Sequence, residues 1–378
     1  MNRVLILGGG FGGIAAAHRL KQKLGNEVEV ILVDRRPYFM VGFRKSWALT
    51  GESPLEAGQR PLEGLSWIGV DVRRGNVDAI LPLEKSAVID GEKIQADALI
   101  VALGADLVPG AVPGFKEHAY NVYDPEDIPR AEKAVNDFKG GKLVIGIFGA
   151  PYKCSPAPYE MAILLNEKFR AKKIKATVEV FSPQPKSLPI LDGESCDSFE
   201  SRLEGNGIAF HPNHKATSIE AGKVNFENKQ IEYDLLLGVP PHKAPMVVRE
   251  SGLTGDSGWV EIDKYTTETS FKGVYAIGDL THVVLANKKP LPKAGLFAEL
   301  MGETAAERIA SIFKGETPQA KFSGEGGCYL EVGKGRAMMV KGNFLAEPEP
   351  IVTLTESSTE YLEEKKRFES DRLEKWFG

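Results

Sequence analysis

The sequence predicts an α/β fold made of two parallel-sheet units and a C-terminal β/α segment. Apolar runs of strand length alternate with helical patterns through the first two thirds of the chain, as in parallel α/β proteins. The chain has 378 residues, more than the roughly 250–300 that one hydrophobic core serves, so we expect at least two domains. Apolar residues (42%) and charged residues (26%) are near the averages for folded proteins, which argues against a disordered or repetitive chain.

The first unit starts at the N-terminus. Its pattern predicts strands over 3–7, 28–33 and 97–103, and a helix over 12–24. A loop over 107–113, with two prolines and a glycine, then marks a domain boundary.

The second unit has strands predicted over 142–148, 177–181 and 233–237, with a helix over 159–172. After two adjacent prolines, a strand over 273–277 and a long helix over 294–313 return to the pattern of the first unit. The tail from residue 322 is irregular and β-like, and it ends in a charged helical stretch over 360–377. We therefore expect a first domain in two parts, 1–108 and 240–320. The second domain is expected over 109–239, and a C-terminal region over 321–378.

A glycine-rich motif opens the first unit. Gly8, Gly10 and Gly13 form G-x-G-x-x-G between a strand and a helix, and Asp34 ends the next strand about 20 residues further on. Such glycines let the backbone approach a pyrophosphate at the helix N-terminus, and the acidic residue binds ribose hydroxyls. The motif predicts a dinucleotide-binding unit of the Rossmann type, and the alternative is a glycine turn without a ligand.

Two distant segments indicate FAD rather than NAD. The sequence from Val274 to Asp279 ends a strand and looks like the flavoprotein segment whose aspartate binds the ribityl chain. The stretch from Ile100 to Ala105 resembles the earlier strand that contacts the same cofactor. For Asp279 a helix cap is the alternative. The candidate cofactor-binding residues are Gly8, Gly9, Gly10, Phe11, Gly12, Gly13, Asp34, Arg35, Val77, Ala102, Gly104, Gly278, Asp279, Lys293 and Ala294, and no metal is expected.

The second unit lacks a glycine-rich turn after its first strand. Three prolines and two tyrosines stand between Gly149 and Glu160, where a pyrophosphate would lie. We infer a degenerate NAD-type domain that has kept the fold and lost the nucleotide pocket.

The three cysteines differ in their surroundings. Cys154 precedes a predicted helix, where free backbone N–H groups and the helix dipole favour a reactive thiolate, although a buried structural cysteine is the commoner case. Cys328 lies in a glycine-dense turn before a strand, which lets a sulfur approach a flat ring closely. Cys196 stands in a polar run and is interpreted as an incidental surface residue.

These motifs resemble the sulfide:quinone oxidoreductases and the flavoprotein subunit of flavocytochrome c sulfide dehydrogenase, over nearly the whole chain. The specific part of the resemblance is the stretch from Ala150 to Glu160 around Cys154, together with the Cys328 segment. The opening glycines, Gly278-Asp279 and the segment from Pro292 to Gly295 are shared by many flavoproteins.

The resemblance implies a redox pair of Cys154 and Cys328 beside the flavin, opened by hydrosulfide, with the two individual roles left open. Glu160 is a candidate acid or base, and an ordinary first-turn helix carboxylate is the alternative. Lys293 would stabilise negative charge on the reduced flavin, or would simply be solvated.

The chain departs from the family in one respect that affects the cofactor. Many quinone-reducing members have a cysteine upstream of the one that matches Cys154, and here none precedes it. The route by which sulfur leaves is therefore open, and non-covalent FAD is expected.

The expected location is the cytoplasm, with the inner face of the cell membrane as the place of reaction with a quinone. Arg3 and the apolar run after it imitate a signal peptide, but its glycines would make a poor helix. Without an export signal, a quinone is favoured over a cytochrome as acceptor. The net charge of −5 gives no reason to expect nucleic acid, and a homo-oligomer is expected. The terminal stretch carries apolar residues at roughly helical spacing that could meet a membrane or pack on the protein itself, namely Tyr361, Leu362, Phe368, Leu373, Trp376 and Phe377.

The leading hypothesis is FAD-dependent oxidation of sulfide to sulfane sulfur or polysulfide, with a quinone as acceptor. The alternatives are a sulfide or persulfide dehydrogenase with a soluble acceptor, a type II NADH dehydrogenase, and a non-catalytic flavoprotein module. A pyridine-nucleotide disulfide reductase would need a cysteine near the flavin in the first domain, and none is present.

Overall fold

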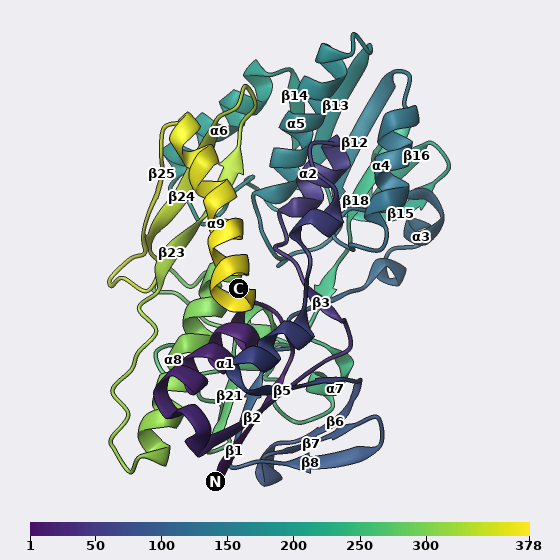
Figure 1. Cartoon of the computed structure of the whole chain (residues 1–378). Helices are drawn as coiled ribbons and strands as arrows, with labels where there is room; N and C mark the ends of the chain where they lie inside the picture. Colours follow the sequence, from purple (N-terminus) through teal and green to yellow (C-terminus); the bar gives the residue numbers. More distant parts are fainter.

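Two parallel five-stranded sheets form the centre of the protein, and a three-stranded antiparallel sheet follows them near the C-terminus (Figure 1). The computed structural model describes residues 1–378. The predicted α/β class with two Rossmann-like units is therefore confirmed. The domain bounds given above stay a prediction.

The first sheet has the strand order β21-β9-β1-β2-β5, and all its pairs are parallel. Val4 and Ile6 face helices on one side of the sheet, while Leu5 and Leu7 face a small antiparallel sheet on the other. This alternation explains why β1 is apolar from Val4 to Leu7, because both of its faces are covered there. The strands are β1 (Asn2–Leu7), β2 (Val28–Asp34), β5 (Val70–Arg74), β9 (Ala98–Val101) and β21 (Val274–Ala276), and the small sheet consists of β6 (Val77–Leu81), β7 (Ser86–Ile89) and β8 (Glu92–Gln95).

Helices α1 (Phe11–Leu24) and α8 (Gly295–Phe313) lie side by side against the first sheet (Figure 1). A Cβ on Gly302 would lie 2.2 Å from the backbone oxygen of Gly12, so only glycine permits this approach. The segment that returns late in the chain is thereby fixed next to the N-terminal glycine motif.

The second sheet has the order β11-β18-β12-β13-β14. The chain passes between the two units twice, and the two connecting segments pair as a two-stranded antiparallel ribbon, β10 (Asp106–Leu107) with β19 (His242–Lys243). The elements of this unit are β11 (Tyr120–Asn121), β12 (Gly141–Ile147), β13 (Ala176–Phe181), β14 (Ile208–His211), β18 (Leu235–Val239), α3 (Phe115–His118), α4 (Ile128–Asp137), α5 (Ala157–Ala171), α6 (Gly193–Gly205) and the hairpin strands β15 (Ala216–Glu220), β16 (Lys223–Phe226) and β17 (Gln230–Glu232).

The tail, expected to be irregular and β-like, is β-structured but regular, and it forms a sheet with the order β23-β24-β25. The helix α9 (Thr359–Phe377) runs beside this sheet toward α1 (Figure 1). The remaining elements are β23 (Glu325–Glu331), β24 (Ala337–Asn343), β25 (Ile351–Leu354), α2 (Arg44–Thr50), α7 (Met246–Arg249), β3 (Tyr38–Phe39), β4 (Arg60–Pro61), β20 (Val260–Glu261) and β22 (Thr281–His282).

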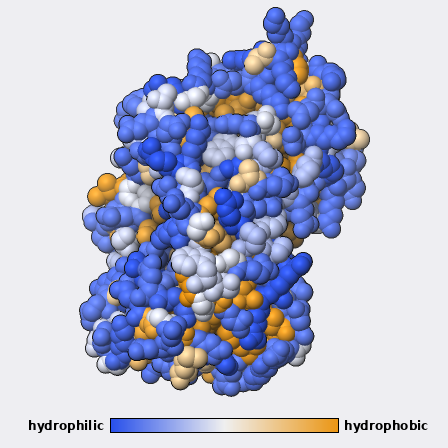
Figure 2. All heavy atoms as spheres, in the orientation of Figure 1, coloured by the Kyte–Doolittle hydropathy of each residue, from blue (hydrophilic) through white to orange (hydrophobic).

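The apolar face of α9 packs mainly on the protein itself. Leu362, Leu373 and Trp376 are buried, and the Trp376 ring lies 5.8 Å from that of Phe11 and 5.3 Å from that of Phe39. These three residues pack on the protein itself, while Tyr361, Phe368 and Phe377 are half-buried. The molecular face in Figure 2 is mostly hydrophilic, with apolar atoms gathered in the lower part of the view, over the first unit. No helix has the combination of length and apolar composition that a membrane span needs.

Candidate active site

The glycine turn after β1 is shaped for close contact with a ligand. Gly8 has a φ of +111°, and a Cβ there would lie 2.3 Å from the backbone oxygen of Ala102. A Cβ on Gly13 would lie 1.9 Å from the oxygen of Gly8, so this glycine serves helix packing. A Cβ on Gly10 would meet nothing within 4 Å, and this open space lies at the start of α1. These three roles fit the pyrophosphate of a dinucleotide.

Asp34 closes this turn from the end of β2. Its Oδ2 accepts the N–H of Gly9 at 2.7 Å, and its Oδ1 accepts the N–H of Arg36 at 2.8 Å. The carboxylate is thereby held at the place where a ribose hydroxyl can reach it. Arg35 points outward with a side chain 72% exposed, 4.0 Å from Asp106, and Val77 is half-buried at the start of β6.

The other predicted FAD segments come to the same edge of the sheet, because β9 and β21 lie next to each other and next to β1 in the strand order. Gly104 has a φ of +67° and open space around it. Gly278 has a φ of +76°, and its N–H approaches the Sδ of Met301 at 3.4 Å. The residues present at this edge therefore fit FAD, which these segments would hold.

Lys293 lies at the entrance to α8, with Ala294 as the helix N-cap. Its Nζ donates to the backbone oxygens of Asp279 and of Thr281, the latter at 3.2 Å, and lies 3.5 Å from the centroid of the Trp259 ring. Burial lowers the pKa of Lys293 to about 8, and Asp279 partly opposes this shift. Lys293 is buried, so the interpretation as a merely solvated lysine is wrong.

Cys154 is held in a strained backbone conformation beside Lys293. Its φ is +54°, which is unusual for a residue with a side chain and is typical of functional sites. Its N–H donates to the oxygen of Lys293 at 2.8 Å, and its own oxygen accepts the hydroxyl of Tyr123 at 3.0 Å. The turn thus links the second unit directly to the segment that begins α8.

The expected low pKa of Cys154 is contradicted by its surroundings. Burial, followed by the charge of Glu160, raises the pKa of the Cys154 thiol to about 11. Lys365 and Lys45 lower it, but less than burial raises it. The N–H of Ala157 bonds to the Cys154 oxygen at 3.0 Å and also lowers the pKa of the thiol, but by less than burial raises it.

Cys328 lies within strand β23, opposite Val340, and not in a turn as expected. A Cβ on Gly327 would lie 2.1 Å from the oxygen of Val340, and one on Gly326 would lie 2.6 Å from the Phe297 ring. These glycines are therefore needed by the protein's own packing. Burial raises the pKa of Cys328, followed by the charges of Cys154, Asp279 and Glu160. Both cysteines, which are free thiols, thus lie within electrostatic reach of each other.

Cys196 is buried and not at the surface, which corrects the expectation from its polar neighbours. It lies in α6, with its Sγ 3.5 Å from the hydroxyl of Ser187 and 3.4 Å from an oxygen of Glu200. Its side chain packs into the second unit, and we assign it no part in the site of the other two cysteines.

A buried ionic cluster surrounds Glu160. Its Oε1 accepts from the Nζ of Lys365 at 2.8 Å, and its Oε2 accepts the backbone N–H of Glu331 at 2.8 Å. Lys365 also contacts Glu331 at 2.7 Å, and the indole N–H of Trp47 donates to that carboxylate at 2.6 Å. Both oxygens of Glu160 are occupied, so it joins α5, β23 and α9 at the base of the cysteine site.

The pKa values in this cluster follow from burial and mutual charge. Burial raises the pKa of Glu160, and Lys365 opposes the rise. Burial alone would lower the pKa of Lys365, but Glu160 and Glu331 outweigh it and raise the pKa. Lys365 was missed by the sequence analysis, although it stands at a packing position of α9, between Leu362 and Glu369.

Comparisons with known proteins agree with this geometry. Residues 2–296 match the pyridine nucleotide-disulphide oxidoreductase family. The mitochondrial sulfide:quinone oxidoreductase of Mus musculus is 27% identical over 367 residues, covering 91% of this chain and 79% of the relative. The sulfide-quinone reductase of Aquifex aeolicus is 26% identical over 340 residues, covering 82% and 76%.

The fold also matches a solved structure. The crystal structure of the sulfide:quinone oxidoreductase from Aquifex aeolicus superposes with a TM-score of 0.90 and 22% identity, over 100% of this chain and 92% of that one. The resemblance inferred from the cysteine segments is confirmed by these comparisons.

Proposed function

Because this chain belongs to the pyridine nucleotide-disulphide oxidoreductase family, we propose that it is an FAD-dependent sulfide:quinone oxidoreductase that works through Cys154 and Cys328. The observation that carries the proposal is the convergence of both cysteines with Lys293 and Asp279. The Cys154 N–H bonds to the Lys293 oxygen, and the charges of Cys154 and Asp279 both raise the pKa of Cys328. A pair of thiols beside a flavin site fits oxidation of a sulfur substrate.

The sulfur chemistry belongs to the two cysteines. In their oxidised state they share a disulfide; the hydrosulfide sulfur attacks one of them, breaks that bond and forms a cysteine persulfide, while the other cysteine leaves as a thiolate. A second hydrosulfide then takes the sulfane sulfur as disulfide anion, HSS−, and frees the thiol. Re-forming the disulfide releases two electrons. FAD, when bound, carries these two electrons to the quinone, which also takes up two protons.

Several residues of the chain support this cycle. Burial raises the pKa of both thiols and so opposes the leaving thiolate, whereas Lys365 and Lys45 lower the pKa of Cys154 and favour that form. Lys293 holds a positive charge at the start of α8, where negative charge would develop on the flavin. Gly8, Gly10 and Gly13 with Asp34 would bind the dinucleotide part, non-covalently, since no cysteine precedes Cys154.

NADH is disfavoured as the electron donor by the turn after β12. Tyr152 is buried there, and a Cβ on Gly149 would lie 3.0 Å from the Cα of Pro241. The turn is filled by protein where a nucleotide pyrophosphate would need a glycine cradle. The quinone acceptor is dissolved in lipid, so the proposed reaction takes place at a membrane surface.

The test is sulfide-dependent quinone reduction by the purified flavoprotein, compared among three cysteine variants. Cys154→Ser and Cys328→Ser should each lose turnover by several orders of magnitude, because a covalent step is removed. Cys196→Ala is the matched control, since this buried cysteine lies away from the site, and it should retain turnover. Full turnover in either of the first two variants would contradict the proposal.

A further inference from the structure

A single buried lysine links the two elements that carry the reactive cysteines. Lys365, in α9, is fully buried, and its Nζ donates to Glu160 at 2.8 Å and to Glu331 at 2.7 Å. Glu160 lies in the first turn of α5, the helix that begins just after Cys154. Glu331 ends β23, the strand that contains Cys328. The ammonium group therefore stands between two carboxylates, each of which is close along the chain to one cysteine.

Direct hydrogen bonds also hold α5 against β23. Glu160 accepts the backbone N–H of Glu331 at 2.8 Å, and Glu167 accepts the N–H of Lys334, just beyond β23, at 3.0 Å. Because β24 occupies one edge of β23, α5 lies along the other, free edge. Lys365 approaches from α9 and joins the side chains on both sides of this contact.

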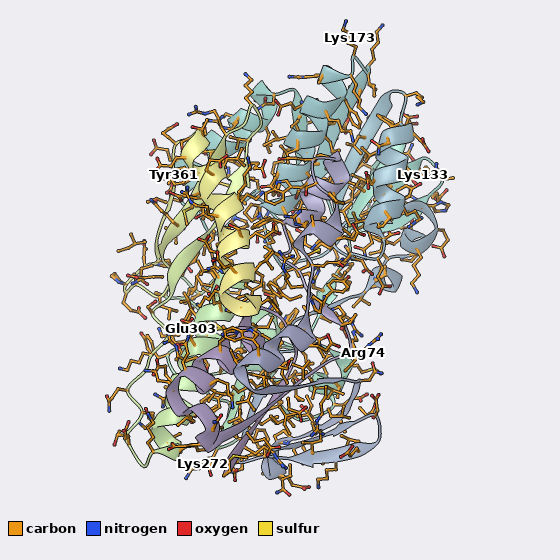
Figure 3. All side chains as sticks on the ribbon, viewed as in Figure 1. Arg74, Lys133, Lys173, Lys272, Glu303 and Tyr361 are labelled. Carbon is orange, nitrogen blue, oxygen red and sulfur yellow. The ribbon has the colours of Figure 1, made fainter.

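The helix α9 covers one face of β23 and extends to α8. The Tyr329 ring of β23 lies 6.2 Å from the Phe368 ring of α9, on the face where Lys365 meets its carboxylates. Figure 3 shows Tyr361 at the first end of α9 and Glu303 of α8 near its last turn. Lys375 donates to Glu303 there at 3.3 Å. The helix is therefore anchored at both ends, and Lys365 stands between them.

The other face of β23 carries Cys328. Neighbouring side chains of a strand point to opposite faces, and β23 pairs with β24 without a register shift, so Cys328 and Gly326 face away from α9. A Cβ on Gly326 would lie 2.6 Å from the ring of Phe297, near the start of α8. The N–H of Cys154 donates to the oxygen of Lys293, just before the same helix. Both cysteine segments therefore meet at the N-terminal end of α8.

We propose that Lys365 is a positioning residue that keeps Cys154 and Cys328 at the separation at which their disulfide closes. Lys365 with Glu160 and Glu331 is called the Lys365 bridge. Without the ammonium the two carboxylates repel each other, so the separation of α5 from β23 is no longer fixed. The inference rests on the proposed function for the redox role of the cysteines, whereas the contacts of the bridge do not depend on it. A fixed separation favours the closed pair, because less freedom is lost when the bond forms.

The test measures how strongly the folded protein favours the closed disulfide. The FAD-loaded protein is equilibrated without oxygen or sulfide in mixtures of glutathione and glutathione disulfide, and the fraction of the Cys154–Cys328 disulfide is measured by peptide mass spectrometry after acid quenching. The two thiols give up two protons and two electrons as their S–S bond forms, and glutathione disulfide takes them up and becomes two thiols. Lys365→Met should lower this equilibrium constant by about tenfold, which raises the reduction potential of the pair by about 30 mV.

Two further variants separate positioning from stability. Glu331→Gln keeps the shape and an accepting oxygen but removes one charge of the bridge, so it should lower the constant by about threefold. This variant decides the question if Lys365→Met does not fold. Arg372→Met is the matched control, because Arg372 of α9 makes another buried ion pair, with Glu299 of α8 at 2.6 Å, and bonds to neither α5 nor β23. It should leave the constant unchanged.

The outcomes distinguish this inference from the proposed function. An unchanged equilibrium constant in both Lys365→Met and Glu331→Gln would overturn the positioning role, and so would an equal fall in Arg372→Met. If the unaltered protein forms no Cys154–Cys328 disulfide in any of the mixtures, the proposed function itself is rejected.

Discussion

Replacing Lys365 with methionine should destabilise the folded protein by about 3–5 kcal/mol. The ammonium is fully buried and contacts Glu160 at 2.8 Å and Glu331 at 2.7 Å. Methionine has a similar volume but leaves both buried carboxylates without their cation. Each lost charge-assisted hydrogen bond costs about 1.5–3 kcal/mol, so two lost bonds give about 3–6 kcal/mol, which overlaps this range.

The assay is equilibrium unfolding in urea followed by tryptophan fluorescence, because Trp47 bonds to Glu331 within the cluster. The matched control is Lys366→Met, one position further along α9, whose side chain is 45% exposed and pairs with Glu363. The control should change the free energy of unfolding by less than about 0.5 kcal/mol. If Lys365→Met shifted the transition no more than Lys366→Met does, the reasoning about the buried cluster would be refuted.

The same variant has a defined pH dependence. Lys365 opposes the rise in the pKa of Glu160, so its removal raises that pKa further. Because the pKa of Glu160 is higher in the folded state, the unfolded chain releases this proton at a lower pH than the folded protein does. The free energy of unfolding therefore falls as pH rises above 4.5, the ordinary pKa of glutamate. The difference between Lys365→Met and the unaltered protein should therefore be smallest near pH 4.5 and grow toward neutral pH.

Two further results are expected. Gly10→Ala should fold normally and lose FAD affinity, because its Cβ enters open space that the pyrophosphate would fill. Gly13→Ala should reduce the melting temperature, because its Cβ would lie 1.9 Å from the Gly8 oxygen. Equal FAD retention in both variants would contradict this assignment. Trp376→Ala should cost about 3–5 kcal/mol in urea unfolding because the ring is fully buried, and a cost below about 1 kcal/mol would show that α9 does not depend on it.

The parts of the fold that the sequence predicted well are those with a strong local pattern. The β1-α1-β2 unit combines strands with buried apolar runs and glycines that the turn needs for steric reasons, so both pattern and spacing indicate it. The return of β21 to the first sheet was visible through Gly278 and Asp279, which form a recognisable strand end.

Other parts depend on partners that are distant in the sequence. The short helix α2 buries Arg44 and Lys45, and the Arg44 guanidinium pairs with Glu369, which no local pattern indicates. Strand β23 contains two glycines, which disfavour a strand locally, and pairing with β24 overrides this preference.

Some misplaced or missing site residues did have a signal. Cys196, Phe199 and Leu203 are spaced as one face of a helix, and this spacing could have identified Cys196 as buried. Lys365 stands three residues after the buried Leu362 of α9, so a charge at a packing position pointed to a buried partner. The pKa of Cys154 could not be predicted, because it depends on burial that only the assembled fold provides.

The central claim is that sulfide reduces the flavin through Cys154 and Cys328, and anaerobic titration of the oxidised protein with sulfide under visible absorbance tests it most directly. The account predicts that the flavin absorbance is lost in the unaltered protein and in Cys196→Ala, and is retained in Cys154→Ser and in Cys328→Ser. An oxidised spectrum that sulfide leaves unchanged in the unaltered protein, or bleaching at equal rates in all four proteins, would contradict it.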